Sequence, residues 1–153
     1  MLSSRALITQ AVHRFWRLRR GFVVDARGAV IDDEGRILLV RDRYQPGWHF
    51  PGGPVKRRET METALARELE QADVRLTGEP KLFGLYANFH GFPSDHVMLF
   101  VVRHWKSANL ISPSGRVAEP RFFAKATLPD DIDESTNTRI LEILDGKEKS
   151  SRW

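Results

Sequence analysis

Apolar and polar positions in the first third of the chain follow a short-strand pattern. Residues 29–32 and 36–40 are apolar runs rich in β-branched residues, and Asp33, Glu34 and Gly35 separate them. Two such runs around a short turn that contains glycine are typical of a β-hairpin. The pattern therefore predicts a hairpin near the start of the folded domain.

The later part of the chain predicts both helices and strands. Residues 52–54, Gly-Gly-Pro, predict no regular element, because proline and paired glycines interrupt strands and helices. Residues 60–71 are strong helix formers, and Thr60 is a suitable N-cap for an amphipathic helix. Further runs predict three strands and a closing helix at 80–87, 96–105, 121–124 and 133–144. The mixture predicts one α/β domain.

Length and composition narrow the class of protein. The chain has 153 residues, 41% of them hydrophobic, which suits a single domain with a sizeable core. No apolar run approaches the ~18 residues of a membrane-spanning helix. The chain has no cysteine, so it has no disulfide framework, thiolate metal site or cysteine nucleophile. These features fit a cytoplasmic protein.

The positive charge is concentrated in an N-terminal arm, residues 1–20. The whole chain carries a formal charge of +4, but the arm holds five arginines and no acid, so residues 21–153 carry −1. Apolar residues in the arm recur every three or four positions, which predicts a basic amphipathic helix. Three interpretations stay open: packing on the domain, contact with an anionic membrane or RNA, and mitochondrial targeting.

One spacing carries the most chemical information. It is Gly53, five residues, Glu59, seven residues, and then Arg67-Glu68-Leu69. An aromatic segment ending in Pro-Gly-Gly precedes it, and a predicted helix follows its Glu59. This spacing resembles the Nudix box, the motif of the Nudix hydrolase family.

The resemblance extends over about residues 25–145 and implies both a fold and an activity. The implied fold is an α/β/α sandwich with a mixed β-sheet, formed here by residues 21–153 as a single domain. The implied activity is hydrolysis of a nucleoside diphosphate linked to another group, by attack of water at phosphorus with Mg²⁺ or Mn²⁺. The implied partner is therefore a nucleotide or another small molecule that contains a diphosphate. The oligomeric state is not predicted.

The resemblance also assigns roles to residues of this chain. Glu68 becomes a catalytic residue and metal ligand, Glu59 and Arg67 become an ion pair that supports the catalytic loop, and Gln71 stands at a second metal-ligand position. The substrate-binding candidates are Trp48, Gly52, Gly53, Lys56, Arg58 and Arg116. For Trp48 and the basic residues, a place in the core or in a solvated loop is the alternative.

The chain departs from the family pattern where acids are expected. A metal-binding face needs carboxylates three and four residues after Glu68, and Gln71 and Ala72 stand there instead. Lys56, Arg58 and Arg116 also stand where the family has acids or glycine. Two hypotheses follow: a metal-dependent hydrolase weakened by these losses, and a nucleotide- or phosphate-binding module without catalysis.

Overall fold

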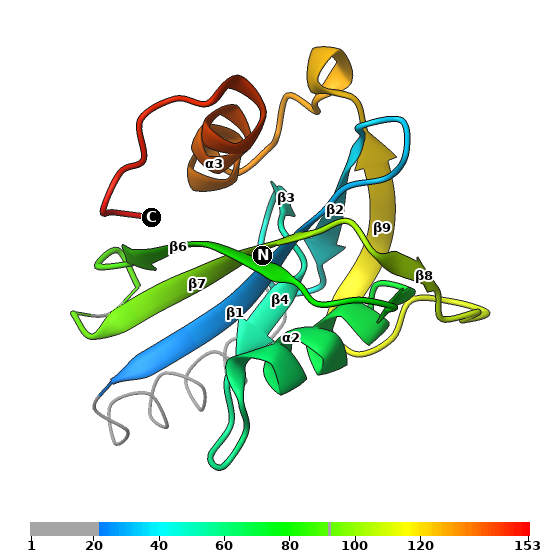
Figure 1. Cartoon of the computed structure of the whole chain (residues 1–153), viewed down its shortest axis with the longest axis horizontal. Coiled ribbons are helices and arrows are strands. Elements are labelled where there is room, and N and C mark those ends of the chain that lie inside the picture. The colour runs from blue at the N-terminus through cyan, green and yellow to red at the C-terminus, as the bar shows by residue number, and fades with distance from the viewer. Residues whose placement is uncertain (1–21, 92) are drawn as a thin grey trace.

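A computed structural model describes residues 22–91 and 93–153, in which one long helix follows the first four strands and the other long helix follows the last strand (Figure 1). The strands are β1 (Val23–Val30), β2 (Ile37–Asp42), β3 (Trp48–His49), β4 (Gly52–Pro54), β5 (Val74–Leu76), β6 (Lys81–Ala87), β7 (Asp95–Val102), β8 (Trp105–Ser107) and β9 (Val117–Phe123). The helices are α2 (Met61–Glu70), the short 3₁₀ helix η1 (Lys125–Thr127) and α3 (Glu134–Asp145).

The strands form a mixed four-stranded sheet, a three-stranded sheet and a β-ribbon. The order in the largest sheet is β4-β1-β7-β6, in which β1 and β7 are parallel and the outer two strands are antiparallel to their neighbours. The second sheet has the order β3-β2-β9, and β5 pairs with β8. Because β1 and β4 are paired, the segment that precedes α2 is fixed to the centre of the fold.

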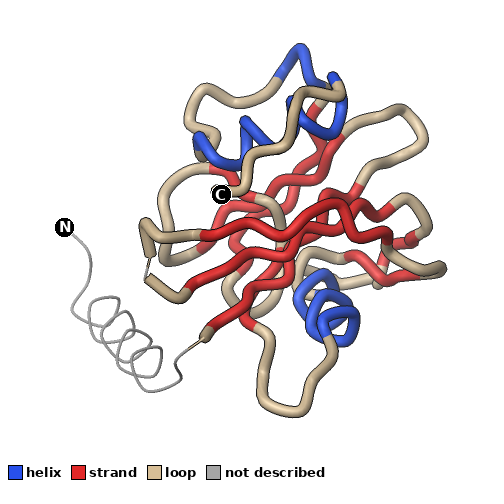
Figure 2. The backbone as a smooth tube through the Cα atoms, turned by 60° about the vertical axis from the view of Figure 1, so that its left-hand side comes forward, coloured by secondary structure: helices blue, strands red, loops and turns tan. Residues whose placement is uncertain are grey.

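The two long helices lie on opposite sides of the strands, so the domain is an α/β/α sandwich (Figure 2). On one side, Ala64, Leu65 and Leu69 of α2 are fully buried against the sheets. On the other side, Ile140 of α3 packs into a second core with aromatic residues such as Phe50. This arrangement confirms the predicted fold class.

The predicted hairpin is only partly correct. A tight turn is present, in which the Asp32 N–H donates to the Arg36 carbonyl over 3.1 Å and Ile31 forms a bridge with Ile37. The two strands then diverge, because β1 pairs in parallel with β7 while β2 pairs with β9. The local sequence therefore predicted the turn correctly. The pairing of β1 and β2 depends on strands that lie far away in the sequence.

Other boundaries also differ from the prediction. Residues 52–54 form β4 instead of an irregular turn, and residues 96–105 are divided between β7 and β8. The strand expected at 121–124 begins earlier, at Val117, and β5 was not predicted. The predictions made for the basic arm fall on residues outside those that the structure describes. Within the described residues, no helix is long and apolar enough to cross a membrane.

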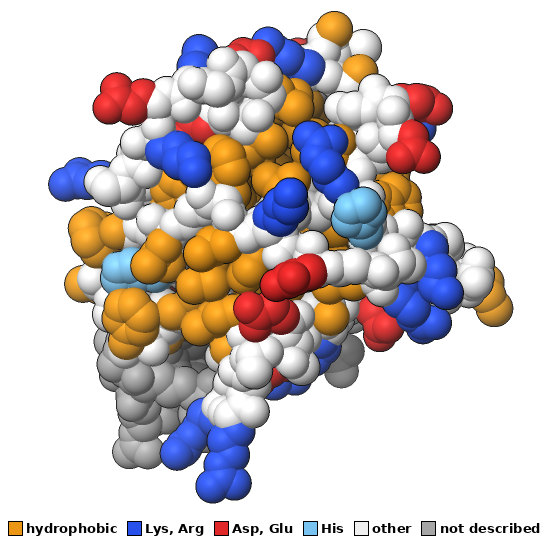
Figure 3. Space-filling model, viewed as in Figure 1, with side chains coloured by type: hydrophobic (Ala, Val, Ile, Leu, Met, Phe, Trp, Pro, Cys, Tyr) orange, Lys and Arg blue, Asp and Glu red, His pale blue; other side chains and the backbone are white. Residues whose placement is uncertain are grey.

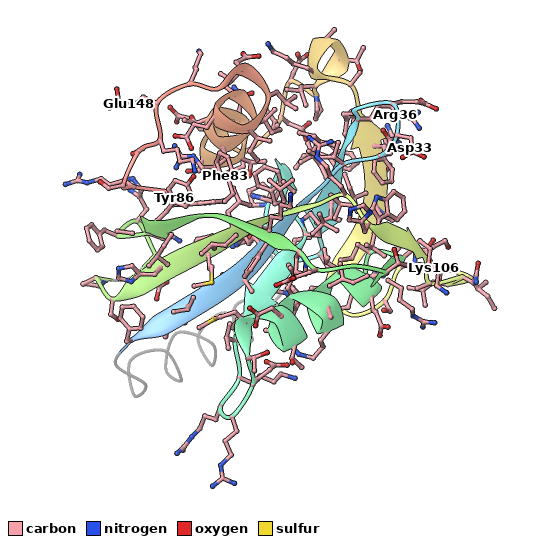
Figure 4. The ribbon with its side chains drawn as sticks, viewed as in Figure 1. Asp33, Arg36, Phe83, Tyr86, Lys106 and Glu148 are labelled. Carbon is pink, nitrogen blue, oxygen red and sulfur yellow. The ribbon has the colours of Figure 1, made fainter. Side chains whose placement is uncertain are left out.

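The side of the sheet beneath α3 is closed by a buried polar network. Phe83 and Tyr86 of β6 lie below α3, and the segment containing Glu148 continues from that helix (Figure 4). The Tyr86 hydroxyl donates to Glu142 over 3.0 Å, and Arg139 pairs with Glu142 at 3.0 Å. Burial, together with the neighbouring Glu142 carboxylate, raises the pKa of Tyr86. Tyr86, Arg139 and Glu142 therefore bind one another beneath α3, although the buried Arg139 Nε has no hydrogen-bond partner among the residues that the structure describes.

Candidate ligand-binding cleft

Helix α2 begins at a capped residue and ends in a tight last turn. The Thr60 hydroxyl accepts a hydrogen bond from the Thr63 N–H at 3.1 Å, as predicted for an N-cap. At the other end, the N–H groups of Gln71, Ala72 and Asp73 each bond to a carbonyl only three residues back. Such 3₁₀-type bonds close a helix. The helix therefore ends just before Gln71.

The N-terminal loop of α2 is held by an ion pair, which we call the loop clamp: Glu59 with Arg67. Arg67 donates from Nε to Glu59 Oε1 at 2.8 Å and from Nη2 to Glu59 Oε2 at 3.0 Å. Arg67 Nη2 also donates to the Pro54 carbonyl at 2.9 Å, and Glu59 accepts from the Lys56 N–H at 2.9 Å. Hydrogen bonding by Arg67 lowers the pKa of Glu59 to about 2. The expected ion pair is present, and it joins β4, the loop and the helix.

Glu68 is buried and both of its carboxylate oxygens have protein donors. Only 7% of the residue is exposed. Arg67 Nη1 bonds to Oε1, and Gln71 Nε2 donates to Oε2 at 3.1 Å. Gly53 lies directly against the carboxylate, since a Cβ atom there would be 2.7 Å from Glu68 Cδ. The glycine of the motif therefore allows the strand to approach Glu68 closely.

Gln71 uses both ends of its side-chain amide. While Nε2 donates to Glu68, Oε1 accepts a hydrogen bond from the Arg116 N–H at 3.2 Å. Gly115 permits this contact, because its φ of +60° suits glycine and a Cβ would overlap Gln71 Oε1. Gln71 therefore connects the end of α2 to the loop before β9.

The Arg116 side chain turns from that loop toward backbone and carboxylate oxygens. Its Nη2 donates to the Gly52 carbonyl at 3.1 Å. Its Nε lies 3.5 Å from Asp42 Oδ2 at the end of β2. Arg116 thus joins β2, β4 and the β9 loop at one point.

These residues surround a shallow hollow that opens to solvent, and we call it the cleft. The polar side chains that line it are Arg27, Asp42, Gln45, His49, Glu68, Gln71 and Arg116. Burial lowers the pKa of His49, and because a carbonyl can only accept, His49 Nε2–H donates to Pro46 O at 2.7 Å. Two guanidinium groups and two carboxylates therefore line the same hollow as a histidine whose pKa is lowered by burial.

The structure brings together some of the sequence-predicted residues and separates others. Glu68, Gln71, Gly52 and Arg116 line the cleft, although they come from three distant segments. Gly53, Glu59 and Arg67 support it from behind through the contacts described above. Four of the predicted substrate-binding and metal-binding residues therefore line the same cleft.

Three further candidates, Trp48, Lys56 and Arg58, neither line the cleft nor support it. Trp48 is 2% exposed in the core, where its ring meets Phe123 edge-on at 4.9 Å. Lys56 and Arg58 are exposed in the β4–α2 loop, and Figure 3 shows Lys and Arg side chains projecting from the tip of that loop. Trp48 thus takes the core position that was its alternative, and a substrate-binding role for the solvent-exposed Lys56 and Arg58 stays a prediction.

A divalent cation does not fit the donors that the cleft provides. The described part of the chain contains no group of three or more acidic, histidine or cysteine residues that would hold a metal ion. Glu68 and Gln71 are bonded to each other, and Asp42 is beside Arg116. Asp73 instead accepts bonds from Ser107 and the Leu110 N–H. Hard cations need several oxygen ligands free to coordinate, and these oxygens already have donors.

The sequence analysis missed two charged residues of the cleft, Arg27 and Asp42. Arg27 and Asp25 interrupt the apolar residues of β1 and pair at 3.5 Å, and the Arg27 guanidinium also donates to the Phe50 carbonyl at 3.4 Å. Asp42 ends the apolar run of β2. A charged residue within or at the end of a buried strand was the available signal for both, since such groups are seldom buried without a role.

Comparison with known proteins identifies a family match over most of the chain. The model of the NUDIX domain matches residues 22–142. This span contains every residue that lines the cleft, together with the loop clamp.

Individual relatives agree with this match. The chain is 27% identical to a MutT-like protein of Streptomyces ambofaciens over 124 residues, which is 80% of this chain and 77% of that protein. It is 33% identical over 89 residues to the 8-oxo-dGTP diphosphatase of Proteus vulgaris, covering 54% of this chain and 77% of the relative. A crystal structure of a MutT NUDIX hydrolase from Burkholderia pseudomallei superposes with a TM-score of 0.65 at 23% identity, covering 79% of this chain and 97% of that one.

Proposed function

Since the chain belongs to the NUDIX domain family, we propose that its cleft binds a nucleoside diphosphate linked to another group, without a resident metal ion and with little hydrolysis. One observation carries this proposal. The carboxylate that resembles the family's metal ligand, Glu68, is bonded at both oxygens by Arg67 and Gln71. Glu68 is therefore occupied by protein donors, whereas the contacts of Arg27 and Arg116 are 3.1 to 3.5 Å long, and in this proposal a phosphate group takes their place.

The ligand class is supported by the relatives and by the charges of the cleft. The matched relatives are named as a MutT-like protein and an 8-oxo-dGTP diphosphatase, and the latter name refers to a nucleotide. Arg27 and Arg116 line the same hollow. Guanidinium groups bind phosphate oxygens through paired, charge-assisted hydrogen bonds. In this proposal the two arginines bind the diphosphate.

The same residues explain why hydrolysis is expected to be weak. Hydrolases of this family generally use divalent ions such as Mg²⁺ or Mn²⁺. A bound metal ion would polarise the diphosphate and activate the attacking water. Even changes behind the metal ligands cost about 10- to 100-fold in other metalloenzymes. Here Gln71 and Ala72 stand at the positions where the family pattern has metal-binding carboxylates. We expect this replacement to lower metal affinity or activity by more than about 100-fold.

Metal-dependent hydrolysis of the same ligand class is the second candidate. The observation that favours it is the preserved support of the motif: Gly53 lies against Glu68, and the loop clamp is intact. In this alternative, Glu68 exchanges Arg67 and Gln71 for Mg²⁺ or Mn²⁺ when substrate binds.

Calorimetry and a turnover assay separate the two candidates. Dinucleotides, nucleotide sugars and nucleoside triphosphates would be titrated into the protein in EDTA and again with Mg²⁺ or Mn²⁺. We expect at least one compound to bind in EDTA, with an affinity that falls as salt rises, and no turnover above a Glu68→Gln variant. Binding that requires Mg²⁺, together with turnover that Glu68→Gln abolishes, would overturn the proposal in favour of hydrolysis.

A further inference from the structure

We propose that the Arg116 guanidinium, positioned by Gln71, is a built-in cation that replaces a divalent metal ion in the cleft. Arg116 would bind the diphosphate directly. The proposal has a second part: changing Gln71 and Arg116 together to acids would turn the cleft into a divalent-metal site. This inference refines the proposed function, but its test does not depend on any nucleotide.

The first support is the set of oxygens around Arg116. Its guanidinium faces the Gly52 carbonyl at 3.1 Å and the Asp42 carboxylate at 3.5 Å. A backbone carbonyl and a carboxylate are the oxygen types that hard divalent ions bind. In this cleft they surround an organic cation, which carries one charge and supplies hydrogen-bond donors of its own.

The second support is the chemistry of Gln71. A glutamate at this position would be three residues from Glu68 on the same helix face, and two carboxylates there repel each other unless a cation lies between them. The glutamine removes that need, because its Nε2 donates to Glu68 Oε2 at 3.1 Å. The amide hydrogens therefore supply Glu68 with the positive partner that a metal ion would supply.

The third support is the way Gln71 fixes Arg116. Gln71 Oε1 accepts from the Arg116 N–H at 3.2 Å, and the Gln71 carbonyl accepts from the Ser114 N–H at 3.2 Å. The Arg116 carbonyl in turn accepts from the Arg43 N–H at 2.8 Å. The backbone of Arg116 and of the residues just before it is therefore held in place before any ligand binds. Such preorganisation reduces the entropy lost on binding.

The charge balance agrees with these contacts. The cleft holds two guanidinium groups, from Arg27 and Arg116, against the carboxylates of Asp42 and Glu68. Each of these carboxylates lies beside a guanidinium group, Glu68 beside Arg67 and Asp42 beside Arg116, so neither offers an uncompensated charge to a divalent cation. The changes Gln71→Glu and Arg116→Glu remove one cation and add two carboxylates, which leaves a strongly negative cleft with several oxygen ligands.

Binding of Mn²⁺ alone tests the metal part of the proposal. The free-Mn²⁺ signal in electron paramagnetic resonance would be measured with the wild type, each single variant and the Gln71→Glu/Arg116→Glu double variant. We expect no binding by the wild type at micromolar Mn²⁺, and binding by the double variant at least ten times tighter than by either single variant. The exposed change Arg103→Glu is the matched control, because it reverses one charge outside the cleft.

Two results would overturn the inference. One is Mn²⁺ binding by the wild type that equals binding by the double variant, and the other is a double variant that binds no more tightly than Arg103→Glu. Circular dichroism and a thermal melt identify a double variant that has not folded. In that case inorganic pyrophosphate, titrated in EDTA into the wild type and Arg116→Gln, decides: an affinity loss of about tenfold or more supports the built-in cation, and an unchanged affinity refutes it.

The outcomes also separate this inference from the proposed function. If the double variant acquires Mn²⁺ but no nucleotide binds the wild type, the proposed ligand is wrong and the built-in cation stands. If nucleotides bind in EDTA but Arg116→Gln leaves their affinity unchanged and the double variant gains no Mn²⁺, the proposed function stands and the built-in cation is wrong.

Discussion

The two ends of helix α2 use arginine in different ways. At the N-terminal end, Glu59 and the Pro54 carbonyl are bound by Arg67, which reaches back from the last turn, also bonds Glu68, and ties the loop to the helix. Beyond the last turn, Arg116 arrives from a distant loop and is held by Gln71 at the edge of an open hollow. The first arginine has its bonds distributed over the protein, whereas the second lies where a ligand can reach it. Arg67 therefore stabilises the loop and helix of the motif, whereas Arg116 is the arginine proposed to bind the ligand.

This difference has a direct consequence for mutagenesis. Changes in the loop clamp should reduce stability, because they leave carboxylates without donors. Changes at Arg116 should weaken ligand binding and have little effect on the free energy of unfolding, because 37% of its side chain is exposed.

Removing the clamp arginine is expected to have the largest effect on stability. Arg67→Ala should lower the free energy of unfolding by about 2–3 kcal/mol, because Glu59 and the buried Glu68 both lose a charged donor. Urea denaturation followed by circular dichroism measures this. Arg75→Ala is the control, since the Arg75–Glu70 pair is exposed and such pairs contribute about 0–1 kcal/mol. Equal losses in the two variants would contradict the role of the clamp.

The pH dependence of stability should report the same ion pair. The pKa of Glu59 is lowered from 4.5 to about 2 by Arg67, so its contribution is complete above pH 4.5 and is lost as the pH falls toward 2. Unfolding free energies measured from pH 6 to pH 2 should fall less steeply in Glu59→Gln than in the wild type. Glu70→Gln, at an exposed position, should retain the wild-type slope. A wild-type curve that matches Glu59→Gln would refute the assignment.

Gly115 tests the connection between the two ends of the site. Gly115→Ala should cost about 1–2 kcal/mol, since it places a side chain at positive φ and against Gln71. Gly35→Ala is a matched control, because Gly35 has a φ of +76° but no atom within 4 Å of an added Cβ. Denaturation should show a larger loss for Gly115→Ala, and pyrophosphate binding should weaken only in that variant. Identical behaviour of the two variants would show that the Gln71 contact contributes nothing.

The smallest stability effect is expected at Arg116. Arg116→Gln should change the free energy of unfolding by less than about 1 kcal/mol, because the Asp42 pair is partly exposed. The same protein samples should be titrated with pyrophosphate in EDTA. A large loss of stability with unchanged binding would reverse the comparison between the two arginines.

The sequence predicted what depends on local contacts. Helix α2 and its Thr60 cap follow from residues within one or two turns, and the Glu59–Arg67 pair follows from the spacing of the motif. The paired strands of the predicted hairpin did not form, because β1 pairs with residues about seventy positions later in β7. No local pattern contains that information.

The composition of the cleft illustrates the same limit. The loss of acids at Gln71 and Ala72 was evident in the sequence, and so was the basic residue at 116. Asp42 and Arg27 were missed because only the sheet order brings β1 and β2 to the end of α2. Trp48 was a candidate for substrate binding with a core position as the alternative, and the structure places it in the core.

The most direct test of the central claim is a calorimetric titration of a nucleoside diphosphate sugar into the wild-type protein, in EDTA and then with excess Mn²⁺. A protein that uses Arg116 and Arg27 in place of a metal should bind the ligand in EDTA, with an affinity that Mn²⁺ changes little. Binding that appears only when Mn²⁺ is present would contradict the account and identify a metal-dependent site.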